Sequence, residues 1–230
     1  MKHALATILS LGLLFTYTFC FAAEKLELKE QKDKESYSLG YQFGQSLRAQ
    51  GLDMNLEAYA SGIKDALGGK NPLLTREEMQ KTVSELQQRM AAARRTELKE
   101  KAEKNLAEGK AFLEENKKKE GVTTLPSGLQ YKILAEGSGK TPKASDQVTV
   151  NYKGTLINGT EFDNSYKRGT PATFQLNKVI KGWTEALQMM KGGSKWQIFI
   201  PPELGYGDRG AGPVPPNSTL IFEVELISVQ

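Results

Sequence analysis

The chain has 230 residues, of which 39% are hydrophobic and 25% are charged, and its formal net charge at pH 7 is +4. These values are ordinary for a soluble protein of one or two domains. Lysines and glutamates alternate along most of the chain, so the sequence lacks the basic stripe of nucleic-acid-binding proteins and no nucleic-acid partner is expected.

The N-terminal residues have the layout of a secretory signal peptide. A Lys-His pair precedes an uncharged apolar run, Ala4 to Phe21, and two alanines follow it. We therefore predict a signal peptide over residues 1–22 and export of the remaining chain to the periplasm, with outer-membrane association left open. The apolar run is also long enough for an uncleaved membrane anchor, which is the alternative.

Removal of this segment would take away the single cysteine, Cys20, and the single histidine, His3. A mature chain without them has no disulfide, no thiol nucleophile, no Ser-His pair and no metal site built from His or Cys. We expect no metal and no cofactor. Any chemistry must come from carboxylates, tyrosines, backbone groups or the shape of a cavity.

Residues 23–74 are predicted to form a helical dimerisation domain. Aromatic residues, glycines and leucine recur at spacings of three and four, which suits a helix packed closely on another helix through its glycines. The recurring residues are Tyr37, Gly40, Tyr41, Gly44 and Leu47. A second helix is expected from Leu52 to Leu67, with Asn55 as its N-cap. Such short, apolar helices favour a homodimer, and a monomeric bundle is the alternative.

Residues 75–120 are predicted to form one long connecting helix. Thr75 and Glu78 match a capping box at its start. From there to about Lys119 the sequence has no proline and a single glycine, Gly109, where the helix could bend. Charges of both signs alternate in its later part, which is typical of a solvated helix with ion pairs between successive turns.

From Gly121 onward, two-residue alternation and Gly/Pro turns replace the helical pattern. Strands are expected at GLQYKIL, QVTVNYKGTL, TEFD, ATFQL, SKWQIFI and STLIFEVELISV. Asn158-Gly159 predicts a hairpin turn, and one short helix is expected from Trp183 to Met190. Residues 121–230 are therefore predicted to form an antiparallel sheet wrapped on one short helix, so the fold class is α+β.

Four stretches of this region together resemble the FKBP-type peptidyl-prolyl isomerases. They are VNYKGTLINGTEFDNS, VIKGWTEALQMMKGG, IPPELGYG and PPNSTLIFEVEL, in the order found in that family. Upstream, SYSLGYQFGQSL, the long charged helix and LPSGLQYKIL are similar to the macrophage infectivity potentiator branch. The resemblance covers the whole mature chain and implies an exported protein that dimerises through its N-terminal helices.

The resemblance implies an aromatic pocket with Trp183 as its floor. Its catalytic residues would be Tyr152, Phe162, Asp163, Ile180, Trp183, Tyr206 and Phe222. Substrate would contact Val179, Ile180, Trp183 and Val214. The Ile180 N–H and the Tyr206 hydroxyl would hold the substrate, and Gly182 would let the backbone turn tightly before the indole. Taken singly, each aromatic or aliphatic residue could be ordinary core packing.

The function implied is faster rotation about Xaa-Pro peptide bonds by non-covalent binding. The partners would be proline-containing unfolded or partly folded polypeptides in exported proteins, and macrolides are candidate inhibitors. Ala172 stands where some family members have a pocket phenylalanine, so we expect weaker macrolide binding. Two alternatives stay open: a chaperone whose helical dimer captures unfolded chains, and an adhesion or virulence factor at the cell surface.

Overall fold

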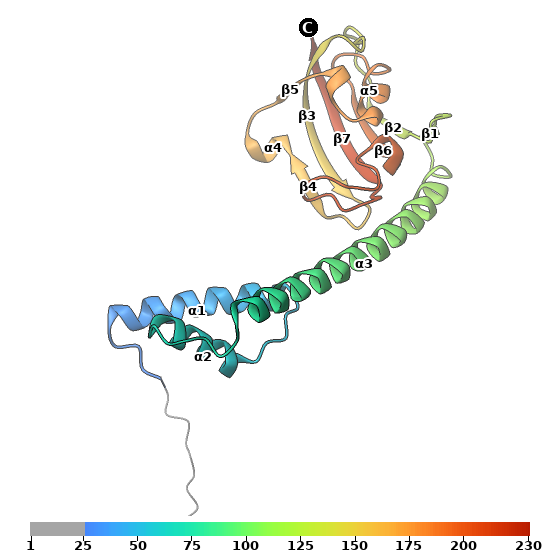
Figure 1. Cartoon of the computed structure of the whole chain (residues 1–230). Helices are drawn as coiled ribbons and strands as arrows, with labels where there is room; N and C mark the ends of the chain where they lie inside the picture. The colour runs from blue at the N-terminus through green and yellow to red at the C-terminus, as the bar shows by residue number, and fades with distance from the viewer. Residues whose placement is uncertain (1–25) are drawn as a thin grey trace, which may run out of the picture. The chain divides into compact units, whose positions relative to one another are not determined.

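The structure is a computed structural model that describes residues 26–230, so the predicted signal peptide lies outside the described residues. The chain divides into two compact units, Met1–Thr75 and Arg76–Gln230. The bar in Figure 1 colours the first unit blue to teal where it is described, and the second green to red. No helix within the described range has both the length and the apolarity needed to cross a membrane.

The first unit contains two helices, α1 (Gln31–Ala49) and α2 (Leu56–Leu67). Asn55 has an extended backbone, and its side chain accepts a hydrogen bond of 3.0 Å from the Ala58 N–H. This N-cap makes α2 begin at Leu56, so the predicted start at Leu52 was wrong. Within residues 31–67 neither helix contains a buried residue, so the two helices have no hydrophobic core of their own.

The second unit begins with α3 (Arg76–Asn116), a single helix of 41 residues. The helix is continuous through Gly109, which is buried. A methyl group at this position would collide with the side chain of Thr219. Gly109 therefore marks a close contact between α3 and the sheet domain, and the bend that the sequence left open does not interrupt the helix.

The C-terminal turns of α3 are held on the sheet domain by aromatic and polar contacts. The rings of Phe112 and Phe199 lie 6.0 Å apart. The Asn116 side chain, only 1% exposed, donates a hydrogen bond of 2.9 Å to Gln130. Gln130 in turn donates one of 2.9 Å to the carbonyl of Leu113. Because buried polar groups need such partners, these bonds fix the last turns of α3 in one position.

Seven antiparallel strands form one sheet in the order β1-β2-β6-β7-β3-β4, with β5 also paired to β3. The strands are β1 (Val122–Thr124), β2 (Gln130–Ala135), β3 (Gln147–Leu156), β4 (Glu161–Asn164), β5 (Ala172–Gln175), β6 (Lys195–Ile200) and β7 (Leu220–Val229). Gly159 has φ of 84° in the β3–β4 turn, which such a hairpin requires. The predicted α+β fold is confirmed. Among the strands only β1 was missed, and the sequence also missed three short helices, described below.

Helix α5 (Lys181–Leu187) packs on the sheet and is drawn beside β6 in Figure 1. It begins two residues before the predicted Trp183 and ends before Met190. Gly182 lies inside this helix without a positive φ, so the predicted tight turn was wrong. A Cβ on Gly182 would lie 2.6 Å from Ile200 Cγ2, so the glycine instead lets α5 approach β6 closely.

Three short helices complete the second unit. They are α4 (Ser165–Arg168) and the single-turn helices η1 (Leu176–Lys178) and η2 (Pro202–Leu204). The first two lie between β4 and α5, and the third follows β6. Of the three, η1 contributes Lys178 to the lining of the cavity described below.

The contacts of α3 with the sheet predict that the isolated sheet domain is less stable when it starts at residue 121. We expect the free energy of unfolding of fragment 98–230 to be higher than that of fragment 121–230 by about 2 kcal/mol or more. The shorter fragment loses the contact between Phe112 and Phe199 and leaves the Gln130 side chain without its partners in α3. Urea denaturation measures the difference. Asn116→Ala in the full chain is the matched point variant, and equal midpoints for both fragments would refute the role given to α3.

Candidate active site

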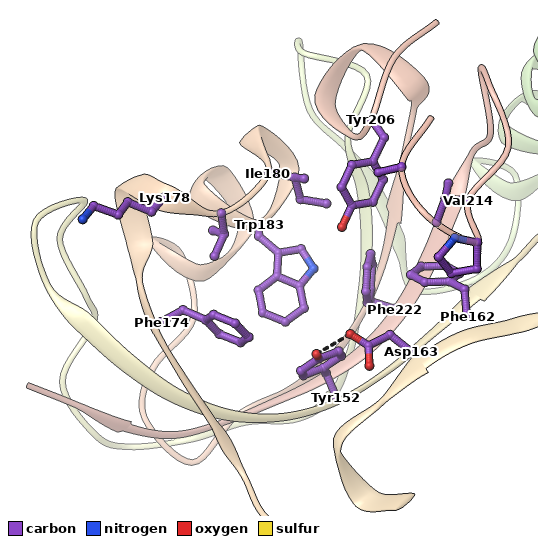
Figure 2. Close-up of a pocket in the computed structure, with 13 residues that line it drawn as sticks. Tyr152, Phe162, Asp163, Phe174, Lys178, Ile180, Trp183, Tyr206, Val214 and Phe222 are labelled. Atoms are coloured by element: carbon purple, nitrogen blue, oxygen red, sulfur yellow. Dashed lines mark hydrogen bonds between the residues drawn. The ribbon is translucent and has the colours of Figure 1, made fainter. Parts of the chain in front are cut away.

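The second unit contains a cavity of about 370 Å³ between α5, β3, β4, β7 and the loop before β7. All nine residues predicted for the site line this one cavity: Tyr152, Phe162, Asp163, Val179, Ile180, Trp183, Tyr206, Val214 and Phe222. Figure 2 shows the labelled ones among them around a common space, with Lys178 at one end and Phe162 and Val214 at the other. The structure thus brings residues 70 positions apart in the sequence to the same place.

Strand alternation explains why two of the rings face inward. Tyr152 continues the row of buried side chains on β3, and Phe222 belongs to the buried row on β7. Gly154 is the register partner of Phe222. A Cβ on Gly154 would lie 2.7 Å from atoms of both Phe162 and Phe222, so its absence makes room for the two rings at the cavity.

The indole of Trp183 forms the floor of the cavity. It is 4% exposed and meets three rings edge to face. Its centroid lies 5.1 Å from that of Tyr152, 5.8 Å from that of Phe174 and 5.2 Å from that of Phe222, at interplanar angles of 87°, 88° and 78°. This is the preferred geometry for aromatic pairs, so the rings hold the indole in one orientation.

One wall of the cavity carries a polar network centred on Asp163. The Tyr152 hydroxyl donates a hydrogen bond of 2.5 Å to Asp163 Oδ2 and accepts one of 2.8 Å from Arg168 Nη2. Arg168 also forms an ion pair with Asp163 Oδ1, which accepts a further hydrogen bond of 2.8 Å from the Asn164 N–H. The carboxylate is therefore held by three donors and has a fixed direction.

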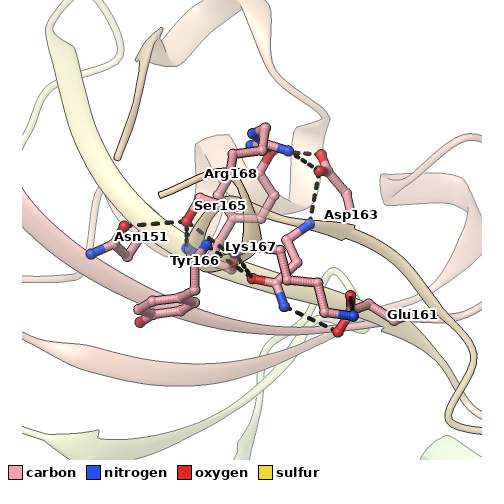
Figure 3. A network of polar contacts seen from close by, with 9 residues as sticks. Asn151, Glu161, Asp163, Ser165, Tyr166, Lys167 and Arg168 are labelled. Carbon is pink, nitrogen blue, oxygen red and sulfur yellow. Dashed lines mark hydrogen bonds and ion pairs between the residues drawn. The ribbon is translucent and has the colours of Figure 1, made fainter. Parts of the chain in front are cut away.

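Helix α4 positions Arg168 for this network, as Figure 3 shows. Asn164 caps the helix by accepting hydrogen bonds from the N–H groups of Tyr166, at 2.9 Å, and Lys167, at 3.3 Å. The fully buried Ser165 accepts a hydrogen bond of 2.8 Å from the Tyr152 N–H, which ties α4 to β3. The short helix is thereby fastened at its first turn, and Arg168 at its end reaches back to Asp163.

The network leaves its acid charged and its phenols neutral at neutral pH. Burial alone would raise the pKa of Asp163, but hydrogen bonds from Tyr152 and Arg168, together with the charge of Arg168, lower it below its usual value. Burial and the bond to Asp163 raise the pKa of Tyr152. Burial and the negative charge of Asp163 also raise the pKa of Tyr206. None of these groups is suited to exchange a proton near pH 7.

The cavity has three unengaged hydrogen-bond donors. One is the indole N–H of Trp183, which is buried and has no partner among the described residues, and the other two are a backbone N–H and a hydroxyl. Ile180 is the N-cap of α5, and its N–H has no acceptor among residues 26–230. The Tyr206 hydroxyl, which points into the cavity in Figure 2, also has no partner in the described part of the chain, and the residue is 38% exposed. The latter two donors can therefore bind a carbonyl oxygen of a ligand.

Comparison with known proteins agrees with this geometry. The family model described as FKBP-type peptidyl-prolyl cis-trans isomerase matches residues 138–227, and that of the domain amino-terminal to it matches residues 32–133. The chain is 48% identical to "Outer membrane protein MIP" of Legionella longbeachae, covering 100% of this chain and 99% of that protein. This chain belongs to the FKBP-type peptidyl-prolyl cis-trans isomerases.

Other relatives of this FKBP-type chain support the same assignment. "Peptidyl-prolyl cis-trans isomerase Mip" of Coxiella burnetii is 46% identical, with 100% of this chain and 99% of that protein covered. The crystal structure of FkpA from Escherichia coli superposes with a TM-score of 0.72 at 41% identity, covering 89% of this chain and 99% of that one. The resemblance identified in the sequence is confirmed.

Sequence reasoning missed several residues of this FKBP-type site. They are Arg168 in the polar network and Phe174, Lys178, Ala211 and Pro213 in the cavity lining. Phe174 follows Ala172 by two positions and therefore lies on the same face of β5. The expectation of weaker macrolide binding rests on Ala172, and Phe174 lines the cavity from two positions further along the same strand. Alternation along β5 was the signal that could have identified it.

The pKa shifts predict a flat pH profile. The folded-state pKa of Asp163 is depressed, so its ion pair is intact above the unfolded pKa of about 3.9 and is lost only as the pH falls through the lower folded value. Tyr152 and Tyr206 stay neutral up to about pH 10 because their pKa values are raised. We therefore expect kcat/KM on a Xaa-Pro peptide to vary less than about twofold between pH 5.5 and 9.

An NMR exchange assay, which needs no coupled protease, measures this profile directly. Asp163→Asn keeps the shape of the residue and removes the charge, and it should lower turnover only moderately, because no proton is transferred. A bell-shaped profile centred near neutral pH would contradict the assignment of Asp163 as a purely electrostatic group.

Proposed function

We propose that this chain accelerates cis-trans rotation of Xaa-Pro bonds in polypeptides, and that the reaction takes place in the cavity above Trp183. The observation that supports this most directly is a cavity lined by aromatic rings, with unengaged donors at Ile180 and Tyr206. The shifted pKa values of Asp163, Tyr152 and Tyr206 make none of these three groups suited to proton exchange near pH 7. Such a site suits a reaction that breaks no covalent bond. Membership of the FKBP-type isomerases supports the same function.

Resonance in the amide explains how a cavity without a nucleophile can act. The planar peptide bond resists rotation with a barrier of about 18–20 kcal/mol, because twisting destroys the resonance. The twisted amide is less polar than the planar one, so an apolar cavity favours it relative to water. Binding that is stronger in the twisted state lowers the barrier, by about 1.4 kcal/mol for each tenfold gain in rate.

Each residue of the site has a role in this proposal. The proline ring stacks on Trp183, with Phe162 and Phe222 at its sides. The Ile180 N–H and the Tyr206 hydroxyl hold substrate carbonyls on one side of the bond while the other side turns. Asp163 keeps Tyr152 in place and sets the electrostatic potential at the rotating carbonyl. Val179 and Val214 provide apolar contact to the flanking residues.

Substitutions at the rings test the proposal. We expect Phe162→Ala and Trp183→Ala each to lower kcat/KM on a Xaa-Pro peptide by about 10- to 100-fold, because the proline loses an apolar wall or its floor. Trp183 is part of the core, so its truncation also lowers stability by about 3–5 kcal/mol. Circular dichroism must therefore confirm folding before rates are compared.

Phe112→Ala is the matched control for these variants. It removes a half-buried ring that contacts Phe199 and does not line the cavity, so it should cost stability and leave turnover near the original level. Phe162 is only partly buried, so we expect Phe162→Ala to lower stability less than Trp183→Ala does. Full activity of folded Phe162→Ala and Trp183→Ala proteins would remove the proposed site.

We also propose that the chain is exported and forms a homodimer through α1 and α2. The charged-then-apolar N-terminal layout and the relative named as an outer-membrane protein support export. The absence of any buried residue in α1 or α2 within residues 31–67 supports dimerisation, because helices without a core need a partner surface. Tyr37, Leu39 and Tyr41 are each more than half exposed.

The glycines of α1 offer a test of the dimer. A Cβ on Gly40 or Gly44 would meet nothing within 4 Å in the single chain, so the single chain leaves room at both positions for a side chain to begin. In a closely packed helix pair the same side chain would clash. We expect light scattering to give a dimer mass for the unchanged protein and a monomer mass for Gly44→Leu. Gln42→Leu, on the opposite side of α1, is the control, and a Gly44→Leu protein that stays dimeric would overturn this interface.

A further inference from the structure

A second, larger groove lies beside the candidate active site. It has a volume of about 780 Å³ and runs between α3 and the loop that precedes β7. Leu98 and Ala102 of α3 form one apolar side, and Pro213, Pro215 and Pro216 form the other. Leu98 is 43% exposed, although it is a large apolar residue. The groove is therefore apolar at its base and open to solvent.

The loop between Asp208 and Pro216 separates this groove from the cavity and belongs to both. Ala211, Pro213 and Val214 line the cavity and also line the groove. The end of the loop is fastened to α3, because the Asn105 side chain donates a hydrogen bond of 2.7 Å to the Pro216 carbonyl. The cavity and the groove are therefore neighbours that share one loop.

The charges at the rim of the groove are mainly positive. Four cations line it, Arg94, Lys99, Lys101 and Arg209, against one anion, Asp208. Of the four, Lys99 faces Glu103 at 3.9 Å, and the other three have no ion-pair partner within residues 26–230. The four-to-one excess of cations gives this rim a local positive charge. It is complementary to acidic side chains.

We propose that the groove binds the acidic flanking segment of a polypeptide substrate whose proline occupies the cavity. This inference rests on the proposed isomerase function and adds a substrate class to it: Xaa-Pro sites with Asp or Glu several residues away. The backbone and apolar side chains of the flank lie against Leu98 and the prolines, and its carboxylates meet Lys101, Arg209 and Arg94. The site is built by α3 and the loop together.

Binding in the groove predicts a particular kinetic signature. The groove lies outside the reacting bond, so its contacts are equally strong in the planar and twisted states of the amide. Uniform binding of this kind lowers KM and leaves kcat unchanged. Solvent-exposed ion pairs are also screened by salt, with a Debye length of about 10 Å at 0.1 M. The effect must therefore fade at high ionic strength.

The experiment compares kcat and KM of the full chain on a peptide series with one central Xaa-Pro bond. The flank carries either two glutamates or two glutamines. Their distance from the proline is varied from roughly two to eight residues on each side, because each extended residue adds about 3.3–3.6 Å and the series therefore samples the distance from the cavity to the groove. At low salt, we expect at least one spacing at which the glutamate peptide has a KM about three- to tenfold lower, and less than about a twofold difference at 0.5 M NaCl.

Charge reversal tests whether the preference for the glutamate peptide arises at the groove. In Lys101→Glu/Arg209→Glu, the ratio of kcat/KM between the glutamate and glutamine peptides should fall to about one or below. Lys143→Glu/Lys191→Glu changes the net charge equally, at exposed residues that line neither the cavity nor the groove, and should keep the original ratio. An unchanged ratio in the first variant, or an equal loss in both, would overturn the groove as the binding site.

Fluorescence anisotropy of the same labelled peptides gives a second readout that does not depend on turnover. If the glutamine peptides are not isomerised at all, the proposed function fails, and the anisotropy still decides whether the acidic flank binds more tightly. If the glutamine peptides are isomerised and no glutamate spacing lowers KM, the groove proposal fails by itself. Displacement of the acidic peptide by a single-stranded oligonucleotide at equal concentration would indicate a general polyanion site and would also overturn it.

Discussion

Edge-to-face packing of aromatic rings around Trp183 is the constraint on which the site depends. A cavity lined by apolar side chains tends to collapse, because every buried apolar contact is favourable. Here Tyr152, Phe174 and Phe222 come from three different strands and each presents a ring at nearly a right angle to the indole. Rotation of any one ring would cost contacts with the others, so the sheet keeps the floor in place and the space above it open.

The polar network completes this arrangement without adding an acid or a base. Arg168 neutralises Asp163, and Tyr152 bridges the two, so the wall of the cavity holds a charge pair whose direction is fixed by hydrogen bonds. A fixed dipole costs no reorganisation when the substrate carbonyl turns. The same tyrosine packs against Trp183 through its ring. The apolar floor and the polar wall are therefore parts of one rigid unit.

Much of this could be predicted from the sequence, and the failures have physical reasons. Alternation of polar and apolar residues predicted both ends of β3, Gln147 and Leu156, correctly. The four family motifs led to nine residues that line the cavity. Arg168 was missed because it is exposed on a helix of four residues, which is too short for any periodic signal. Gly182 was misread as a tight turn although it has no positive φ, and the sequence left open whether the helix bends at Gly109. The role of the two glycines is close approach to Ile200 and Thr219, and such contacts exist only in the folded chain.

Helix α3 shows why a solvated appearance in sequence does not exclude a function. Its alternating charges are typical of a helix that faces water, and most of its length has no buried residue within 76–116. Yet the bonds at Asn105 and Asn116 fasten it to the sheet domain, so the side chains one turn earlier face the loop that borders the cavity. An element fastened to a wall of the site restricts that wall. The helix therefore supports a wall of the cavity, although none of its residues in 76–116 lines the cavity itself, and it also connects the two halves of the chain.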